Sequence, residues 1–354
     1  MRILYVGRNA KIGGGSTFRL NIGRGMLARG HDVAIAALGG PMVARYQKAG
    51  IRYHWIPPFT ICSGMLARAI RRHKVELVHA SNTTAGDLAL RGCQSAGVPF
   101  VVSLHNTITR REAQHPCLKE ARQIIVFDTG AAASAGKFTH EFNTSKIVRV
   151  PRPVEHRSVD PDKISPLHVA YVARLSSRKG KVALSVIEAF GGFAREHPGA
   201  RLTILGDGSM RNEVIQHAAR VVRDADCEIQ VRGPVIDPHV MLETAGVLIG
   251  AGYAALEAVM QGRAVIGAGF KGYGVVTEAN VLDAIECNFG DTVGRWEMSP
   301  ANFREALGDV ASGWGTPETR TRFWALDRIV APIHGIDGVA ARLEEIYREV
   351  VGTR

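Results

Sequence analysis

Short apolar runs alternate with segments whose apolar residues recur at three- and four-residue spacings along most of the chain. The alternation is clearest between Leu167 and Glu257, where the apolar runs predict strands and the segments between and after them predict helices. The strand-like runs lie at residues 169–173, 202–205, 227–231 and 246–250. Strands that alternate with helices in this way predict a parallel sheet covered by helices on both faces.

The first half of the chain shows the same alternation. Its predicted strands lie at residues 1–6, 33–38, 51–56, 75–79, 100–104, 124–127 and 147–150. After the first of them, Gly13-Gly14-Gly15 precedes a predicted helix at Thr17–Ala28, with Ser16 as its expected N-cap. A glycine loop at a helix start presents bare backbone N–H groups to an anion, but tight strand-to-helix turns also use glycine for geometry.

The length of 354 residues predicts two domains, because it exceeds what one typical core accommodates. We expect a first domain at residues 1–155, a polar linker at 156–166, a second domain at 167–315 and a helical segment at 316–354. The last segment ends in an amphipathic helix at Gly338–Val350.

Targeting and redox signals indicate a cytoplasmic protein. No apolar window approaches the ~20 residues of a membrane span, and the chain opens directly into a predicted strand, so we expect no signal peptide. The five cysteines are scattered and show neither metal-ligand spacing nor a disulfide framework.

The net charge of +11 belongs to the first half of the chain. Residues 1–150 carry 21 Lys+Arg and 7 Asp+Glu, whereas residues 151–354 carry 23 and 26. An excess of +14 in one half favours an anionic partner such as a membrane phospholipid, a phosphorylated lipid carrier or nucleic acid. The chain contains no recognisable nucleic-acid-binding module, so we expect no nucleic acid partner.

Several polar residues directly follow predicted strands, where open α/β sheets bind ligands. Arg174 and Lys179 follow the run at 169–173, and His79 and His105 follow strands of the first half. Cations at the start of a helix are disfavoured by the helix dipole unless an anion binds there. The alternative for each of these residues is a solvated surface cation or a hydrogen-bonded structural histidine.

Four motifs in the second half together resemble the donor half of family 4 glycosyltransferases, which have the GT-B fold. They are Arg174-Leu-x-x-x-Lys179-Gly180, Leu205-Gly206-Asp207-Gly208, Gly233-Pro234-Val235, and Leu256-Glu257-Ala258 with Gly262. The glycine loop, joined to Arg29-Gly30-His31-Asp32-Val33, resembles the start of many such enzymes. The resemblance implies two doubly wound, Rossmann-like α/β domains facing across a cleft, with the C-terminal helix crossing back to the first domain.

The resemblance also implies site residues. Arg174 and Lys179 would bind the donor diphosphate. Other groups implied for the diphosphate are Gly14, Gly15, Tyr253, Ala254 and Ala255. Glu257, read as preceding a helix, would accept hydrogen bonds from the ribose or cap that helix, and Gly233, Pro234 and Val235 would contact the nucleobase. His105 matches the active-site histidine, and Arg110 and Arg111 could hold an anionic acceptor or simply be solvated.

The implied reaction moves a hexose-type sugar from a nucleotide-sugar, most naturally a UDP-sugar, to an acceptor hydroxyl with retention of configuration. Fixed cations and backbone dipoles would meet the charge of the leaving group, so we expect no metal and no other cofactor. Asp224-Ala225-Asp226 resembles a metal-binding motif, but it ends a predicted helix away from the expected cleft. A saccharide or lipid-linked acceptor at the inner membrane surface suits the basic first domain, as in polysaccharide, lipopolysaccharide or glycolipid synthesis.

Two departures from the family pattern leave other functions open. The family usually has a glutamate eight residues before the position of Glu257, and Ile249 stands there. Arg152-Pro153 replaces the usual asparagine-glycine pair of the interdomain link. The alternatives are a sugar-nucleotide epimerase of GT-B-like shape and a catalytically degenerate protein that binds sugar nucleotides.

Overall fold

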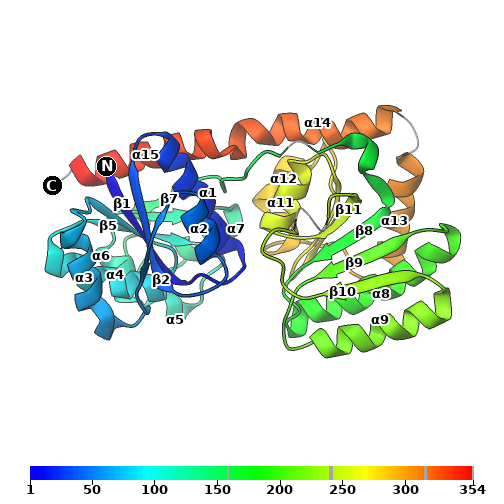
Figure 1. Ribbon diagram of the computed structural model, residues 1–354, viewed down its shortest axis with the longest axis horizontal. Coiled ribbons are helices and arrows are strands. Elements are labelled where there is room, and N and C mark those ends of the chain that lie inside the picture. The colour runs from blue at the N-terminus through cyan, green and yellow to red at the C-terminus, as the bar shows by residue number, and fades with distance from the viewer. Residues whose placement is uncertain (158, 239–241, 315–316, 353–354) are drawn as a thin grey trace. The chain divides into compact units, whose positions relative to one another are not determined.

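The computed structural model describes residues 1–157, 159–238, 242–314 and 317–352 (Figure 1). The chain divides into two compact units. Unit 1 comprises Met1–Pro153 and Ile333–Arg354, and unit 2 comprises Val154–Pro332. None of the described helices combines the length and the hydrophobicity that a membrane crossing requires.

Unit 1 contains a parallel seven-stranded sheet in the order β3-β2-β1-β4-β5-β6-β7. Its strands are β1 (Arg2–Asn9), β2 (Asp32–Leu38), β3 (Arg52–Trp55), β4 (Leu77–Ala80), β5 (Phe100–Leu104), β6 (Ile124–Val126) and β7 (Ile147–Arg149). The strand order reverses between β1 and β4, which is the switch point of a doubly wound sheet.

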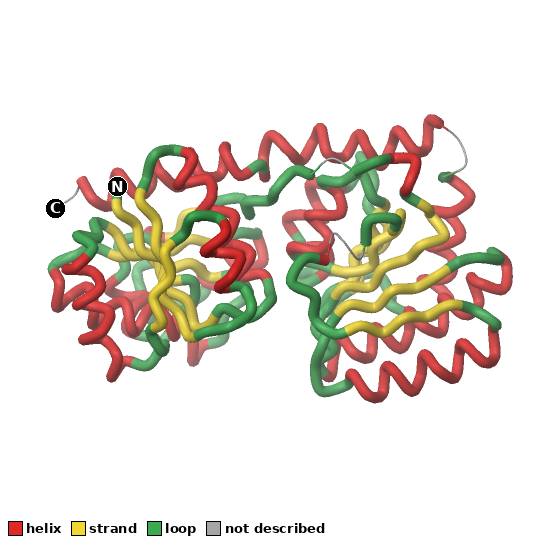
Figure 2. The backbone as a smooth tube through the Cα atoms, in the orientation of Figure 1, coloured by secondary structure: helices red, strands yellow, loops and turns green. Residues whose placement is uncertain are grey.

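Helices cover both faces of this sheet (Figures 1 and 2). They are α1 (Gly14–Ala28), α2 (Val43–Lys48), α3 (Ser63–Arg72), α4 (Thr83–Ala96), α5 (Arg110–Ala113), α6 (Pro116–Glu120), α7 (Thr129–Gly136) and α15 (Ile336–Gly352), with 3₁₀ turns η1 (Thr60–Cys62) and η2 (Thr144–Lys146). Leu4 of β1 packs in one core cluster with Leu66 of α3 and Leu88 of α4. Its neighbour Tyr5 points to the opposite face, where α1 and α15 pack together.

Helix α15 makes polar contacts with the rest of unit 1 through Tyr347 and Glu344. The Tyr347 hydroxyl lies 2.5 Å from His79 Nδ1 in β4. The Glu344 carboxylate pairs with Arg348 of its own helix and with Arg29, which follows α1. These hydrogen bonds lower the pKa of Glu344 to about 2, so the carboxylate stays charged at neutral pH.

Unit 2 contains a six-stranded sheet in the order β10-β9-β8-β11-β12-β13. Its strands are β8 (Ser165–Val172), β9 (Arg201–Leu205), β10 (Glu228–Arg232), β11 (Ala245–Gly250), β12 (Ala264–Ala268) and β13 (Gly272–Val275). All neighbours are parallel except β12 and β13, an antiparallel edge that the sequence pattern did not predict. The order reverses at β8, so unit 2 is doubly wound as well.

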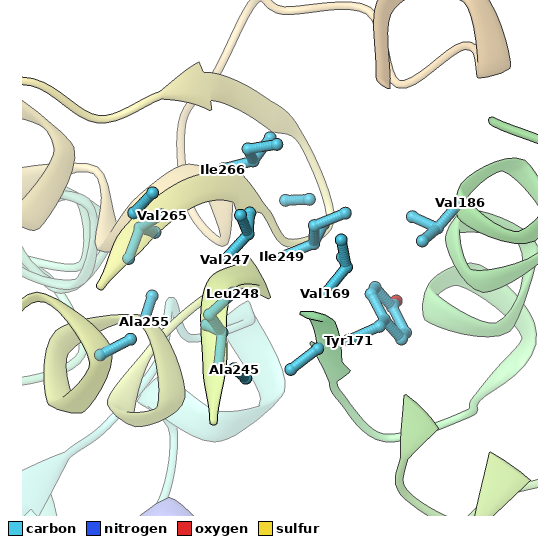
Figure 3. Packing of buried hydrophobic residues seen from close by; sticks show 14 of the residues in the cluster. Val169, Tyr171, Val186, Ala245, Val247, Leu248, Ile249, Ala255, Val265 and Ile266 are labelled. Atoms are coloured by element: carbon cyan, nitrogen blue, oxygen red, sulfur yellow. The ribbon is translucent and has the colours of Figure 1, made fainter. Parts of the chain in front are cut away.

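The helices of unit 2 also lie on both faces of its sheet (Figure 1). They are α8 (Ser177–Glu196), α9 (Arg211–Ala225), α11 (Tyr253–Val259), α12 (Val281–Glu286), α13 (Pro300–Gly313) and α14 (Pro317–His334), with 3₁₀ turns η3 (Pro161–Lys163) and η4 (Asn288–Gly290). Helix α8 packs against α9 and α13. Figure 3 shows Val186 of α8 on the side of the sheet where Val169 and Tyr171 point, and Ala255 of α11 on the other side. The predicted fold class is thus confirmed for each unit.

The helix starts differ from the sequence predictions at one important place. Helix α1 begins at Gly14 with Gly13 as its N-cap, so the prediction that Ser16 caps it is wrong. Ser16 lies inside the first turn, where its N–H and that of Thr17 donate to the Gly13 carbonyl. Two further predictions fall on residues outside the described part of the chain. The segment between β10 and β11, for which a helix is predicted, contains residues 239–241. The predicted boundary between the second domain and the C-terminal helical segment falls at residues 315 and 316.

We expect the free energy of unfolding to fall in mild acid because two histidines are buried. Burial is the main cause that lowers the pKa of His79 to about 3 and that of His168 to about 4. An unfolded chain protonates both near pH 6.5, so the unfolded state binds more protons below that pH and folding weakens as pH falls. We expect each histidine to cost about 2 kcal/mol on going from pH 6.5 to pH 5.

Urea unfolding at pH 7.5 and pH 5 measures this loss. The conservative variant His168→Gln keeps hydrogen-bonding capacity toward Thr203 and Thr244, which lie 3.0 and 2.8 Å from the ring nitrogens. It should show a shallower pH dependence than the parent chain. Equal midpoints for the parent at the two pH values would contradict the prediction.

Candidate functional site

The carboxyl edge of the unit 2 sheet collects most of the predicted donor-binding groups. Strand β8 lies between β9 and β11, and the chain leaves β8 and β11 toward opposite faces. Arg174 and Lys179 follow β8, and Gly252 precedes α11 after β11. The structure therefore brings the two cations and the start of α11 to the switch point of this sheet.

The two predicted phosphate-binding cations differ in their surroundings. Arg174 is exposed and makes no hydrogen bond or ion pair with the described residues. Lys179 is buried in the first turn of α8, and its Nζ lies 2.6 Å from Asp291 Oδ1. The same ammonium group lies 4.7 Å from the centroid of the Phe270 ring. Asp291 thus compensates a buried charge that the helix dipole alone would disfavour.

A hydrogen bond from the sheet also fixes the first turn of α8. The hydroxyl of the buried Tyr171 donates to the Lys179 carbonyl at 2.7 Å. The loop after β8 is tied to the loop after β9, because Leu175 N donates to the Asp207 carbonyl and Met210 N donates to the Leu175 carbonyl, both at 2.9 Å. The Gly206-Asp207-Gly208 motif therefore supports the loop that carries Arg174.

Asp291 reaches Lys179 from an unusual backbone turn. Asn288, Phe289 and Gly290 have φ values of 51°, 55° and 83°, in the left-handed region. Bulky residues rarely adopt this conformation, and it persists only where the surroundings impose it. Asp291 Oδ1 also accepts the backbone N–H of Phe270 at 3.2 Å.

Sequence reasoning missed Asp291 and Phe270. Phe270 follows β12 at the carboxyl edge, so the rule that ligand-facing residues follow parallel strands could have pointed to it. Asp291 follows no parallel strand and left no comparable signal in the sequence.

Helix α11 begins earlier than predicted. Its N-cap is Gly252, with φ 66° and ψ −138°, a conformation that favours glycine. Tyr253, Ala254 and Ala255 form the first turn, where backbone N–H groups point toward the start of the helix. Glu257 lies inside α11, and the interpretation that it precedes a helix and caps it is therefore wrong. Glu257 lines a small pocket together with Val172 at the end of β8, with Leu248 and Ala254 among the other lining residues.

The predicted nucleobase-binding segment lies further along the same edge. Gly233, Pro234 and Val235 follow β10, the edge strand, and β9 separates β10 from β8. Pro234 is exposed, and Val235 packs partly against the core of unit 2. The structure places these residues on the same sheet edge as Arg174, but not on a neighbouring strand end.

Ile249 is a core residue of β11. Its side chain is fully buried, and its register partner on β8 is Tyr171. Figure 3 shows Ile249 beside Val169 and Tyr171, on the side of the sheet covered by α8. Because α11 covers the other side, Ile249 and Glu257 belong to different faces of the sheet.

The switch point of unit 1 holds a second buried cation. Arg19 of α1 is 3% exposed. Its guanidinium donates to Ser81 Oγ at 2.7 Å, to the Asn9 carbonyl at 2.6 Å and to Ser16 Oγ at 3.0 Å. These bonds join the end of β1, the residue after β4 and the first turn of α1. Gly7 is required here, because an added Cβ would lie 2.5 Å from Arg19 Cζ.

Arg19 carries a positive charge beside the glycine loop without a carboxylate partner among the described residues. Its Nε has no hydrogen-bond acceptor there either. Gly14 and Gly15 form the first turn of α1, and a Cβ added to Gly15 would lie 3.9 Å from Arg19 Nη1. Sequence reasoning missed Arg19, since an arginine inside a helix usually faces solvent.

His105 lies at the carboxyl end of β5 in an aromatic setting. Its ring stacks on the Phe127 ring, with 4.7 Å between the ring centroids, and packs edge to face with the Phe18 ring, with 5.1 Å between the centroids. Burial, followed by the positive charges of Arg152 and Arg19, lowers the pKa of His105 well below its usual range. The imidazole is therefore neutral at physiological pH. His79, by contrast, is fully buried and bonded to Tyr347, which is a structural role.

The remaining arginines of the predicted acceptor region are exposed or paired. Arg110 and Arg111 begin α5, and Arg110 lies 3.5 Å from Glu141. Arg152 stands where the family usually has the asparagine of the interdomain link. It is buried and donates to Asp128 Oδ2 at 2.8 Å and to the His105 carbonyl at 3.2 Å. Arg152 thus fixes the backbone that carries His105.

Comparison with protein families supports the resemblance found in the sequence. Residues 12–157 match the family model of Glycosyltransferase Family 4. The four donor-half motifs that suggested the family lie in the second half of the chain, outside the matched residues, whereas the glycine loop and Arg29–Val33 lie inside them. No curated protein sequence gives a significant match.

Comparison with solved structures shows the GT-B fold over the whole chain. A glycosyltransferase from Rickettsia africae has 17% sequence identity and a TM-score of 0.75, covering 100% of this chain and 99% of that chain. Anabaena Alr3699/HepE in complex with UDP has 15% identity and a TM-score of 0.74, covering 99% and 100%. Sucrose-phosphate synthase from Thermosynechococcus elongatus has 15% identity and a TM-score of 0.70, covering 100% of both chains.

Removal of the Asp291 charge should destabilise unit 2. Asp291→Asn keeps the size of the side chain but leaves the Lys179 ammonium buried without a counter-ion. We expect a loss of about 1–3 kcal/mol in the free energy of unfolding at pH 7. Urea unfolding of Asp291→Asn beside Asp309→Asn, a change at an exposed aspartate, measures the effect. Equal stabilities of the two variants would contradict a supporting role for the pair.

Proposed function

We propose that this chain, whose residues 12–157 match Glycosyltransferase Family 4 and which has the GT-B fold, transfers a hexose-type sugar from a UDP-sugar to an acceptor hydroxyl. Unit 2 binds the donor, and unit 1 presents the acceptor. The anomeric configuration of the sugar is retained in the product.

One observation carries the proposal: the switch point of unit 2 brings two cations to the edge of the sheet at which helix α11 begins. Arg174 is exposed at the end of β8, Lys179 is fixed in the first turn of α8, and Gly252 starts α11 beside them. A diphosphate at this edge would meet both fixed charge and backbone donors. The Anabaena protein of the same fold is solved with UDP and also with UDP-glucose, which supports a uridine nucleotide as the donor.

The donor half works by stabilising the leaving group. As the bond to the sugar breaks, negative charge grows on the nucleoside diphosphate. The Arg174 fork can hold two phosphate oxygens, and the Lys179 ammonium supplies a compact charge. In this scheme Asp291 keeps Lys179 in position before the donor arrives. Fixed protein groups meet the whole charge, so the proposed reaction needs neither a metal nor another cofactor.

The transfer itself requires no separate base. The acceptor attacks the anomeric carbon on the face that the diphosphate leaves, and the departing phosphate oxygen takes the acceptor proton. His105 is neutral at pH 7, so it offers the sugar a hydrogen bond and no charge. Arg152 holds the His105 carbonyl, which keeps the ring against Phe127.

The acceptor in this proposal is anionic or lipid-linked. Residues 1–150 carry the whole excess of positive charge, with 21 Lys+Arg against 7 Asp+Glu. Such a charge favours a phosphorylated saccharide or lipid-linked acceptor at the cytoplasmic face of a membrane. Synthesis of a cell-surface polysaccharide, a lipopolysaccharide or a glycolipid would use that chemistry.

A second candidate is a sugar-nucleotide-binding protein without turnover. It is favoured by the burial of Ile249, since no carboxylate can reach the donor sugar from that strand position. Thermal-shift screening against nucleotides and nucleotide-sugars identifies the donor in either case, because a ligand of the folded state raises its stability. Product analysis with and without an acceptor extract then separates the functions. A transferase needs the acceptor, an epimerase converts the donor alone, and a binding protein gives no product.

Arg174→Ala should weaken UDP binding by roughly 1.5–3 kcal/mol, the usual scale for hydrogen bonds to charged groups. Isothermal titration calorimetry with UDP measures the loss. Arg223→Ala is the matched control, because Arg223 is exposed in α9 of the same unit and lies before β10, at the opposite edge of the sheet. An Arg174→Ala affinity equal to that of the control would remove Arg174 from the phosphate site.

Restoring the family glutamate by Ile249→Glu should not raise activity and should destabilise unit 2. A carboxylate at this position is enclosed by the apolar core under α8. Burial of this kind raises a carboxyl pKa by about 3–5 units, so the buried side chain is largely protonated at pH 7, which costs roughly 3.5 kcal/mol of folding free energy there. Urea unfolding beside Ile249→Val, which should cost about 0.5–1.5 kcal/mol, gives the comparison. A stable and more active Ile249→Glu chain would show that the strand can present this side chain to a donor.

A further inference from the structure

Unit 1 exposes five large hydrophobic side chains from two strand ends and from the segment that follows β3. Ile61 is 90% exposed, Phe59 62%, Trp55 57%, Met65 43% and Leu38 38%. These five form what we call the apolar edge, and they include every exposed large hydrophobic residue of residues 1–153, all of which are described. Four of the five lie between residues 55 and 65, and Leu38 ends the strand next to Trp55, so exposed apolar groups accumulate in one region, as they do on surfaces that bind a partner.

The backbone of the apolar edge is held by the fold. Ile56 N donates to the Ala37 carbonyl at 3.2 Å, and Cys62 N donates to the Phe59 carbonyl at 2.8 Å. Ile56 and Leu66, which flank the exposed residues in the sequence, are buried in the core of unit 1. The exposed side chains are therefore presented from an anchored segment, and their exposure is not the result of a loose loop.

The apolar edge lies on the ligand-binding side of the unit 1 sheet. Leu38 ends β2, Trp55 ends β3, and the register pairs Ala37 with Trp55. Both strands run parallel to β1, so their ends share the carboxyl edge with the glycine loop. A surface bound to the apolar edge would thus lie on the same side of unit 1 as Gly14, Gly15 and Arg19.

The part of the sequence that supplies the apolar edge is rich in positive charge. Residues 1–75 contain 13 arginines and lysines and a single carboxylate, Asp32. Asp32 is already paired with Arg52. On α3, Met65, Arg68 and Arg72 follow one another at helical spacing along one face, and all three are exposed. The exposed apolar groups therefore continue directly into a basic helix face.

We propose that the apolar edge, with Arg68 and Arg72, docks unit 1 on the surface of an anionic lipid bilayer. Trp55 and Phe59 would lie at the headgroup level, Ile61 would enter the acyl region, and the arginines would contact anionic headgroups. A second copy of this chain is disfavoured, because it would bring two surfaces of like charge together. Nucleic acid would meet the arginines but leave the aliphatic Ile61 and Met65 without a role.

Vesicle co-sedimentation of the full chain tests the proposal. The chain should sediment with vesicles that mix phosphatidylcholine and phosphatidylglycerol, and much less with phosphatidylcholine alone. Ile61→Ser should lower the partition coefficient at least about tenfold, because it removes an apolar side chain from the bilayer. Arg68→Glu should lower it at least about fivefold and make the remaining binding less sensitive to salt.

Matched variants separate docking from general effects. Leu282→Ser changes a side chain of unit 2 that is 50% exposed, and it should bind vesicles as the parent does. Arg223→Glu reverses an exposed charge in unit 2 and should change binding less than Arg68→Glu. A cooperative urea unfolding transition of Ile61→Ser with the midpoint of the parent chain would show that the variant is folded. Vesicle binding does not depend on the proposed sugar transfer, so failure of either proposal leaves the other to be judged separately.

Several results would overturn the proposal. One is equal binding to the two kinds of vesicle, and another is equal loss in Ile61→Ser and Leu282→Ser. A dimer in light scattering that Ile61→Ser dissociates, with vesicle binding unchanged, would assign the apolar edge to a second copy. Retention of RNA at near-physiological salt that Arg68→Glu abolishes, without vesicle binding, would assign the basic face to nucleic acid.

Discussion

The ion pair between Lys179 and Asp291 is the interaction on which the candidate donor site depends. A cation in the first turn of a helix opposes the helix dipole by about 0.3–1 kcal/mol, and burial of the ammonium adds to that cost. Asp291, 2.6 Å away, offsets both. It is delivered by consecutive left-handed residues, a conformation that costs about 1–3 kcal/mol for each non-glycine residue. The fold accepts this strain to keep a positive charge at the edge of the sheet, where an anionic ligand gains from it.

Arg19, a buried cation of unit 1, is held in a different way. Arg19 donates only to neutral oxygens, so its charge is solvated by the protein but not cancelled. The uncancelled charge helps to lower the pKa of His105 and of His79, which keeps both rings neutral. It also adds to the positive potential beside the glycine loop, on the sheet edge that carries the apolar edge. Charge, neutral imidazole and exposed hydrophobic groups therefore act on the same side of unit 1.

The strands and their parallel order followed from the sequence, because the apolar period and the strand–helix alternation are local properties. The placement of Arg174 and Lys179 at a strand end followed for the same reason. The start of α11 differs from the prediction, because Gly252 caps the helix before the position of Glu257. Asp291 could not be predicted, because its role depends on a turn that only tertiary packing imposes. Arg19 could not be predicted either, because its burial requires the missing side chain of Gly7.

The case of Ile249 shows why motif spacing can mislead where geometry decides. Side chains alternate between the two faces of a strand, so a residue of β11 either enters the core under α8 or points toward α11. The side chain of Ile249 enters the core under α8, because its register partner Tyr171 points to the same face of the sheet. The carboxylate that the family pattern leads one to expect would have to arise beyond the strand, after Gly250. Only glycine, alanine and tyrosine occur there before α11 begins to turn, so any contact to a donor sugar from this segment must come from backbone groups or from Tyr253.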